Sequence, residues 1–446
     1  MVASPSPKKM TPMLAAGAAV FILFLGWLID VQFGDGSTSV EATAINEEVE
    51  LPAAEDTPDA VDAEAEADSL AVPATSSTVS EQVTSTVPST TTTIAETSPF
   101  VPSSWARETV ESLSLEELVA QLFVVELTPE NADTSLANNQ WGGVFLILED
   151  ETLQDAADFI TRIQQNALDT GIGLIVSSDV EGGAITKMPV EPFELPANLP
   201  DSDEEITSIN RRVAGELCSA GLNLNLAPVA DVDIEQNPVL ANGRSFSTDP
   251  NEVARYIDLF INAYNNQPGP IATTTKHFPG HGATNIDSHR SPANVGTRAN
   301  LEQFHIEPFQ TAIAAYETQP GTIMIGHLIV DDQTEPATFA PEIVNGWLRN
   351  DLGYNGVIIS DDLAAMEAIT DRPPAQRALD ALTAGIDILL WVDPAAAEAA
   401  KTAVITEITN NPTGNIAQTV TESATRILEL KEQLGLHTNN TTRCGN

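Results

Sequence analysis

Three of the six histidines in this 446-residue chain lie within fourteen residues, in the segment KHFPGHGATNIDSH that starts at Lys276. Clustered imidazoles can bind a metal, stabilise a loop or transfer protons. A zinc-binding helix carries two histidines four residues apart on one face. The residues between His277 and His281 are Phe-Pro-Gly, and proline interrupts a helix. We therefore do not expect a metal site in this segment.

The second half of the segment has the spacing of a proton-transfer pair. Asp287 precedes His289 by two residues, so its carboxylate can hold one tautomer of the imidazole and raise its basicity. We expect His281, between the two halves, to be structural. If the segment moves, Gly280 and Gly282 are the expected positions of its hinge.

Further polar residues directly follow short apolar runs. Asp361 comes after such a run and one serine, where the tip of a strand would present it to a pocket, and we expect a functional role for it. Asp231 and Asp233 are expected to form turns or caps. Asp362 is expected to cap a helix that begins at the next residue. Glu181, followed by two glycines, fits a turn and a functional role equally well.

The elements that must position these residues alternate between apolar runs and amphipathic stretches. Eight apolar runs have the pattern of strands: Gln121–Leu127, Gly143–Leu148, Gly173–Ser178, Leu222–Ala227, Ile271–Lys276, Thr322–His327, Gly356–Ser360 and Ile386–Val392. Strands that alternate with helices predict a parallel sheet. Eight such units over about 300 residues predict a single (β/α)8 TIM barrel. An open doubly wound sheet is the alternative, but no GxGxxG motif follows an early strand.

The barrel is expected to occupy residues 100–437, followed by a flexible tail at 438–446. Residues 1–35 contain the uncharged run Met13–Ile29, which follows two lysines and has no evident cleavage site. This run predicts a single-pass membrane anchor with the barrel outside the cytoplasm. A cleaved signal peptide, and hence a secreted protein, is the alternative. Residues 36–99 are acidic and rich in Ser, Thr and Pro, which predicts a disordered linker.

The formal net charge is −45, and the acidity extends over both the linker and the barrel. Such a chain lacks the basic surface that general nucleic-acid binding requires, so we exclude that class of protein. The two cysteines, Cys218 and Cys444, predict neither a disulfide framework nor a CxxC metal site. We expect the protein to be a monomer.

Several segments, in chain order, resemble glycoside hydrolase family 3, and within it the bacterial β-N-acetylhexosaminidases of the NagZ type. The matching segments are SDVEGG, LNLAPVADV, GRSFSTDP, KHFPGHGATNIDSH, IMIGH, PATFAPEIVNGWLRNDLGYNGVIISDDLAAMEAI and ALTAGIDILL. The resemblance implies a TIM-barrel enzyme that hydrolyses terminal, non-reducing β-linked N-acetylglucosamine with retention of configuration, typically from peptidoglycan fragments. It implies no metal and no organic cofactor. The expected partners are a glycan that contains N-acetylglucosamine and, through the N-terminal helix, a membrane.

The same resemblance implies roles for individual residues. Asp361 would be the nucleophile that forms a glycosyl-enzyme intermediate. His289, oriented by Asp287, would be the general acid and then the general base, in place of the second carboxylate of most retaining glycosidases. The residues implied to bind the sugar hydroxyls are Asp179, Lys187, Arg244, Lys276 and His277.

One departure from the family pattern concerns substrate binding. The family commonly reads EGGRVQR where this chain reads EGGAITK, so Ala184 and Lys187 stand in place of two arginines. Lysine lacks the forked geometry of arginine, which leaves the substrate open. A β-glucosidase, a phosphorylase and a non-catalytic barrel that binds wall glycans are the alternatives. The DSH sequence argues against the first, and the joint presence of Asp361, Asp287 and His289 argues against the last.

Overall fold

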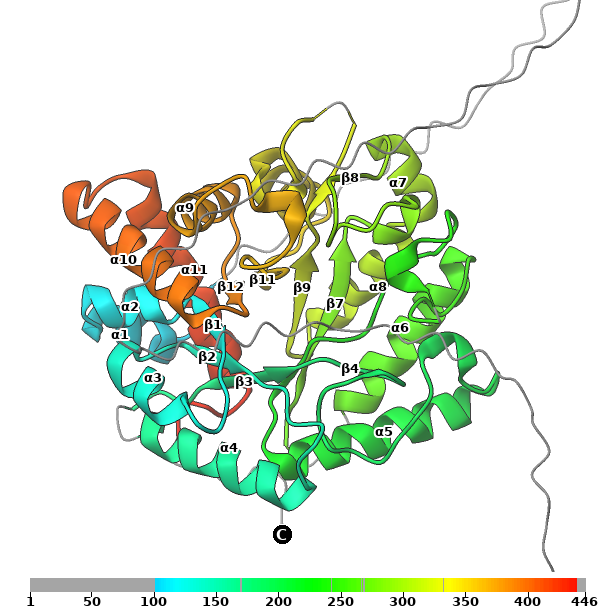
Figure 1. The fold of residues 1–446 in the computed structure, drawn as a ribbon, viewed down its shortest axis with the longest axis horizontal. Coiled ribbons are helices and arrows are strands. Elements are labelled where there is room, and N and C mark those ends of the chain that lie inside the picture. The colour runs from blue at the N-terminus through cyan, green and yellow to red at the C-terminus, as the bar shows by residue number, and fades with distance from the viewer. Residues whose placement is uncertain are drawn as a thin grey trace, which may run out of the picture. The chain divides into compact units, whose positions relative to one another are not determined.

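Eight parallel strands form a barrel in the part of the chain that the computed structural model describes, which is residues 101–438 without residues 169–170, 242, 266, 268 and 332 (Figure 1). The strands are β1 (Phe123–Glu126), β2 (Gly143–Phe145), β3 (Ile175–Ser178), β6 (Leu224–Asn225), β7 (Ala272–Phe278), β9 (Gly321–Ile325), β11 (Val357–Ser360) and β12 (Leu389–Trp391). Each overlaps one of the eight apolar runs. The barrel prediction is therefore confirmed for the described residues.

The strand order in the sheet is β11-β9-β7-β6-β3-β2-β1-β12, with every neighbouring pair parallel. A single bridge between Ile359 and Ile388 joins the two outermost strands, β11 and β12. The sheet is thus nearly closed, and its closing seam has fewer backbone contacts than its other strand pairs.

A buried carboxylate reinforces this seam. Asp387 accepts hydrogen bonds from the backbone N–H of Ile358 on β11 (2.8 Å) and from Ser423 Oγ on α11 (2.8 Å). Its oxygens also pair with Arg426 (3.0 Å) and with Arg349. Asp387 and its four partners are all at least partly buried. Their contacts therefore join α11 to the strand pair that closes the barrel.

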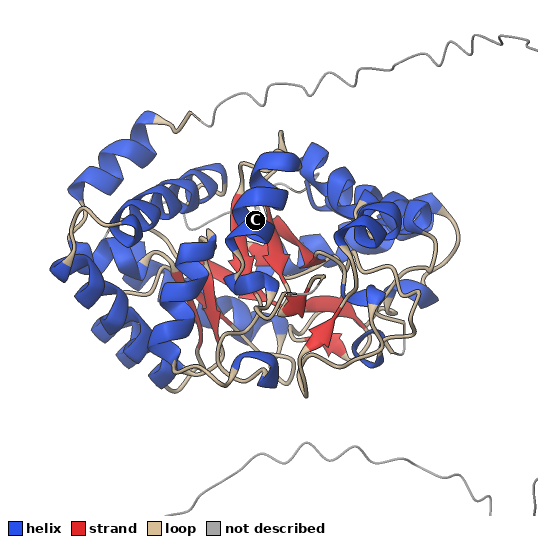
Figure 2. Cartoon of the chain, turned by 90° about the horizontal axis from the view of Figure 1, so that it is seen from above, coloured by secondary structure: helices blue, strands red, loops and turns tan. Residues whose placement is uncertain are grey.

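Helices surround the strands (Figures 1 and 2). The α-helices are α1 (Ser104–Ser112), α2 (Leu115–Ala120), α3 (Ala132–Asn139), α4 (Leu153–Leu168), α5 (Asp203–Ala220), α6 (Pro250–Asn265), α7 (Arg298–Phe304), α8 (Glu307–Tyr316), α9 (Pro374–Ala384), α10 (Pro394–Asn410) and α11 (Asn415–Gln433). The π-helix η5 spans Glu342–Asp351. Short elements complete the described fold: β4 (Val180–Gly182), β5 (Ile185–Thr186), β8 (Ala293–Asn294), β10 (Leu328–Ile329), and the 3-10 helices η1 (Pro196–Asn198), η2 (Pro238–Leu240), η3 (His281–Ala283), η4 (Ala337–Phe339) and η6 (Glu367–Ile369).

Local sequence explains why these helices form and where they end. The α4 helix buries apolar side chains at helical spacing, which are Ala156, Phe159, Ile160 and Ile163. At the start of α5, the Ser202 side chain accepts a hydrogen bond from the backbone N–H of Glu205. The helix ends at Gly221, whose φ of 91° lies in the left-handed region that glycine adopts without strain.

Two expectations about local structure need correction. Asp362 caps no helix: it accepts hydrogen bonds from the backbone N–H groups of Ala364 and Ala365 in a turn, and from that of Val392 beside β12. Cys218, on α5, is disulfide-bonded. A chain with only two cysteines gives no signal of this disulfide.

The predicted anchor and linker, residues 1–35 and 36–99, also lie outside the described residues. So does the predicted tail, apart from Thr438. Among the helices of the described residues, none combines the length and apolarity that crossing a bilayer requires.

Candidate active site

The carboxyl ends of the barrel strands carry the polar residues that the sequence singles out. In a parallel barrel these ends lie at one face, so residues from distant parts of the chain meet there. Asp179 directly follows β3, and Lys276 and His277 lie near the end of β7. Asp361 directly follows β11. The barrel topology therefore explains how side chains more than 180 residues apart form one site.

A cluster of two cations and two carboxylates occupies part of this face. Lys276 Nζ lies 2.6 Å from Asp179 Oδ1 and 2.6 Å from Glu181 Oε1. Arg244 binds both oxygens of Glu181 through Nε and Nη2, each at 2.8 Å. The side chains of Glu181 and Lys276 are 1% and 3% exposed, whereas that of Asp179 is 28% exposed. Asp179 is thus the member of the cluster that a ligand reaches most easily.

Mutual pairing keeps the buried members of this cluster charged. Burial favours the neutral form of Glu181, but Arg244 and Lys276 hold its pKa far below the usual range. Burial likewise opposes the charge of Lys276, yet Asp179 and Glu181 raise its pKa. The cluster therefore offers charged donors and acceptors at neutral pH, which form stronger hydrogen bonds to hydroxyl groups than neutral partners do.

Asp231 is the buried anchor of the KHFPGH half of the histidine segment. Its carboxylate lies 2.7 Å from His277 Nδ1, and it accepts hydrogen bonds from the backbone N–H groups of His277 (3.2 Å) and His281 (2.6 Å). Burial alone would raise the pKa of Asp231, but His277 and His281 lower it. The expectation of a simple turn or cap is wrong for Asp231. Asp233 does form a turn, because it accepts the backbone N–H of Asn237 (2.7 Å).

His281 is structural, as expected. Its Nδ1 lies 2.6 Å from Asn237 Nδ2, and its Nε2 lies 2.8 Å from Ser288 Oγ. Burial lowers the pKa of His281 to about 4, although the neighbouring Asp231 opposes that shift. A neutral imidazole with both nitrogens hydrogen-bonded ties the first half of the segment to the start of the second.

The two glycines beside His281 are held by close packing. A Cβ atom on Gly282 would lie 2.0 Å from the carbonyl oxygen of Val232. Gly280 has a φ of 131°, and a Cβ atom there would lie 2.8 Å from Cβ of His305. Glycine is needed at both positions so that the backbone can approach its neighbours. The role of these glycines as a hinge stays a prediction.

Asp287 and His289 form the pair that their spacing predicts. Asp287 Oδ1 accepts the backbone N–H of His289 (2.9 Å) and lies 2.9 Å from its Nδ1. The side chain of His289 is 58% exposed, and that of Asp287 is 24% exposed. Burial opposes ionisation of Asp287, but the two hydrogen bonds from His289 lower its pKa. The imidazole is thus oriented through Nδ1, which leaves Nε2 available for proton transfer.

Asp361 is ionised across the whole physiological range. Burial would raise its pKa, but the charges of His277 and His327 and a hydrogen bond from the backbone N–H of Asp362 (2.8 Å) lower the pKa to about 2. The nearby His289 also lowers the pKa of Asp361. The same rim of the barrel thus carries a partly buried carboxylate with negative charge and an exposed imidazole that can carry a proton.

Lys187 stands apart from the cation–carboxylate cluster. Its Nζ pairs with Glu149 (2.9 Å). Its backbone N–H donates to the carbonyl oxygen of Asp179 (2.8 Å), so the residue lies beside the cluster while its ammonium group points elsewhere. A role for Lys187 in sugar binding stays a prediction.

The sequence did not predict the roles of two carboxylates of the site. Asp231 was expected to form only a turn or cap, and the role of Glu181 was left open. Asp231 lies between Ala230 and Val232, and an acid flanked by apolar residues after a strand is a usable signal of a buried anchor. Glu181 has no comparable signal, because its buried position follows from Lys276 and Arg244, which are distant in sequence.

Comparisons with known proteins agree with this geometry. The model of the glycosyl hydrolase family 3 N-terminal domain matches residues 114–430. Beta-hexosaminidase A of Pseudoalteromonas piscicida is 31% identical over 56% of this chain, which spans 45% of that protein's length. Beta-hexosaminidase LpqI of Mycobacterium tuberculosis is 30% identical over 63% of this chain and 74% of its own.

A solved structure gives the same result. The family 3 beta-N-acetylglucosaminidase of Paenibacillus sp. is 26% identical, with a TM-score of 0.68 over 74% of this chain and 64% of that one. The family match covers most of the chain and includes every strand of the barrel and all the site residues described above. The chain therefore belongs to glycosyl hydrolase family 3.

Proposed function

We propose that the protein is a retaining β-N-acetylhexosaminidase that removes terminal, non-reducing β-linked N-acetylglucosamine. The observation that carries this proposal is that one site holds both an ionised Asp361 at the end of β11 and an exposed His289 that Asp287 orients. A nucleophilic carboxylate and a separate proton donor are the two groups that retention of configuration requires. The names of the relatives, which are beta-hexosaminidases, support the choice of sugar.

In the first step, one oxygen of Asp361 attacks the anomeric carbon of the terminal sugar. The bond to the glycosidic oxygen breaks, and His289 gives that oxygen the proton of its Nε2. Asp287 stabilises the imidazolium before the transfer through its contact with Nδ1 (2.9 Å). The products of this step are the shortened glycan, a neutral His289 and a sugar bound covalently to Asp361.

In the second step, neutral His289 takes a proton from a water molecule through Nε2. The water oxygen attacks the anomeric carbon and releases Asp361 as a carboxylate. The high exposure of His289 suits this step, because the imidazole must meet both a leaving glycan and an incoming water. A pKa of about 2 also makes the Asp361 carboxylate a good leaving group.

The cation–carboxylate cluster suits the recognition of sugar hydroxyls. Asp179 and Arg244 are its more exposed members, with side chains 28% and 14% exposed. Lys276 and Glu181 lie beneath them and fix their positions. His277, held through Nδ1 by Asp231, can donate or accept through Nε2 toward the ring. Such preorganised partners orient the anomeric carbon toward Asp361.

We further propose that the natural substrate is peptidoglycan or its fragments, met outside the cytoplasm. The uncharged run Met13–Ile29 and the long acidic linker support a tethered or secreted protein. The disulfide at Cys218 adds independent support, because structural disulfides persist mainly in oxidising compartments. Cell fractionation tests this location: recovery of the protein in the cytoplasm would exclude it.

The test of the activity uses the full chain with nitrophenyl β-N-acetylglucosaminide and nitrophenyl β-glucoside. We expect the first substrate to be hydrolysed faster, and Asp361→Asn to reduce its hydrolysis at least about 10³-fold, because the nucleophile is lost. Asp233→Asn, at a turn carboxylate of the same face, is the matched control and should retain the rate. A normal rate in Asp361→Asn would refute the nucleophile.

Inorganic phosphate distinguishes hydrolysis from phosphorolysis. A neutral histidine beside the covalent intermediate would not repel a phosphate anion, so a phosphorylase is a second candidate. Release of sugar 1-phosphate in phosphate buffer would replace the hydrolase by that activity. A preference for the glucoside would overturn the sugar, and a folded protein that turns over neither substrate would indicate a glycan-binding barrel.

A further inference from the structure

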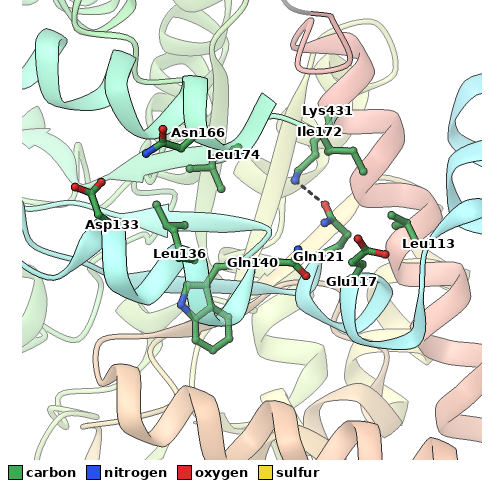
Figure 3. A pocket seen from close by; sticks show the side chains of 13 residues that line it. Leu113, Glu117, Gln121, Asp133, Leu136, Gln140, Asn166, Ile172, Leu174 and Lys431 are labelled. Atoms are coloured by element: carbon green, nitrogen blue, oxygen red, sulfur yellow. Dashed lines mark hydrogen bonds between the residues drawn. The ribbon is translucent and has the colours of Figure 1, made fainter. Parts of the chain in front are cut away.

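A cavity lies at the opposite end of the barrel from the candidate active site. Its volume is about 260 Å³. Gln121, Trp141 and Leu174 line it, and each of them lies just before a barrel strand, β1, β2 and β3 respectively. The amino ends of these strands therefore form its floor, whereas the active-site residues follow the carboxyl ends. Side chains from α2, α3, α4 and α11 form the remaining walls (Figure 3).

A buried lysine is the unusual feature of this cavity. The Lys431 side chain, on α11, is 1% exposed, and its Nζ donates to Gln121 Oε1 at 2.7 Å (Figure 3). Among the described residues, no carboxylate forms an ion pair with Lys431. An ammonium group has three N–H donors, so one hydrogen bond to the protein leaves two of them unmatched.

Burial of an unpaired ammonium is unfavourable unless a partner compensates for it. Burial lowers the pKa of Lys431 to about 7, so a substantial fraction of the molecules carries the charge at neutral pH. Two carboxylates, Glu117 and Asp133, also line the cavity, but each has its own partner. Glu117 accepts the backbone N–H of Ser114 (2.9 Å), and Asp133 pairs with Arg162.

The remaining lining sets the shape of a suitable partner. Leu113, Leu136, Ile172 and Leu174 offer an apolar surface beside the ammonium. At ~30 Å³ for each water-sized unit, the cavity holds roughly nine non-hydrogen atoms. A barrel face at the amino ends of the strands normally serves stability alone. A buried charge does not serve that purpose, since apolar residues of similar size pack there at no electrostatic cost.

We propose that this cavity binds a small monocarboxylate with a short apolar body, whose carboxylate pairs with the ammonium of Lys431. The apolar body contacts the leucine and isoleucine side chains. The carboxylate accepts hydrogen bonds from the two N–H groups of the Lys431 ammonium that do not bond to Gln121. The site is separate from the glycan site, and it is independent of the activity proposed above.

Isothermal titration of the full chain with sodium hexanoate tests this proposal, because hexanoate matches the cavity in size. We expect saturable binding, and binding of 1-hexanol and hexylamine at least about tenfold weaker, since neither supplies an anion to the ammonium. Lys431→Met keeps an unbranched side chain of nearly the same length and removes its charge, and should weaken hexanoate binding by a similar factor.

Leu136→Trp is the second variant, because it fills the cavity and leaves Lys431 intact. It should abolish hexanoate binding while the circular dichroism spectrum stays unchanged. If Lys431→Met fails to fold, Leu136→Trp and the comparison with 1-hexanol still decide. Absence of saturable binding, or equal binding of hexanoate and 1-hexanol, would overturn the proposal and leave a water-filled cavity. Competition by N-acetylglucosamine would also overturn it, because the ligand would then occupy the glycan site.

Discussion

The two halves of the histidine segment are held in different ways. In the first half, Lys276, His277 and His281 are all buried, and each is hydrogen-bonded to residues from other parts of the chain. In the second half, Asp287 and His289 are bonded mainly to each other, and the imidazole is exposed. Residues that are neighbours in sequence therefore differ in burial and in how many contacts hold them in place.

This difference corresponds to two chemical requirements. Groups that orient a sugar ring are most effective when their positions are fixed before the substrate arrives. A general acid that later acts as a base must meet a leaving glycan and then a water, so it needs access to solvent. Glycine at positions 280 and 282 lets the backbone at the end of the first half pack closely against His305 and Val232. Three predictions test the difference between the halves.

The largest expected effect follows removal of the exposed imidazole. His289→Ala should reduce hydrolysis of nitrophenyl β-N-acetylglucosaminide about 10²- to 10⁴-fold, the usual contribution of a general acid–base group. The melting temperature should change little, because the side chain is 58% exposed. Arg290→Ala, at the exposed neighbour, is the control and should retain activity. A large fall in melting temperature for His289→Ala would contradict the proposed difference between the halves.

A smaller effect, on stability, is expected from removal of the buried anchor. Asp231→Ala leaves the backbone N–H groups of His277 and His281 and one imidazole N–H without an acceptor. The free energy of unfolding should fall by about 3 kcal/mol or more, because each buried donor left unsatisfied costs ~1–3 kcal/mol. Urea unfolding measures this change. Asp233→Ala, which loses one turn hydrogen bond, should cost much less, and equal losses would refute the anchor role.

The smallest effect concerns acid pH. The pKa of Asp361 is about 2 in the folded protein and ordinarily 3.8, so its ionisation stabilises the fold fully above about pH 4. That contribution is lost as the pH falls toward 2. The free energy of unfolding of the wild type should therefore fall more steeply between pH 4 and pH 2 than that of Asp361→Asn. Parallel pH profiles would show that the neighbouring histidines do not hold Asp361 ionised.

Much of this arrangement could be predicted from the sequence, because strand ends and residue spacing are local properties. The apolar runs predicted all eight barrel strands, and the position of Asp361 just after one of them predicted that it lies at the rim. The spacing of Asp287 and His289 predicted their contact. In each case the informative residues are neighbours in the chain.

The other features of the site depend on contacts between residues that are distant in sequence, and these contacts could not be predicted from one sequence. Glu181 is buried because Lys276 and Arg244 compensate its charge. Asp231 is an anchor because two histidines some fifty residues later fold over it. The Lys187 ammonium pairs with Glu149 on another loop. The disulfide at Cys218 belongs to the same class, since two isolated cysteines specify no partner geometry.

The seam between β11 and β12 has a consequence for the order of folding during synthesis. Asp387 makes most of the side-chain contacts at that seam, and two of its partners, Ser423 and Arg426, lie on α11, the last helix of the described residues. A nascent chain exposes all eight strands before it exposes that helix. The contacts of Asp387 with Ser423 and Arg426 can therefore form only after all eight strands have been synthesised, so the closing seam gains its buried ion pair later than the strands themselves.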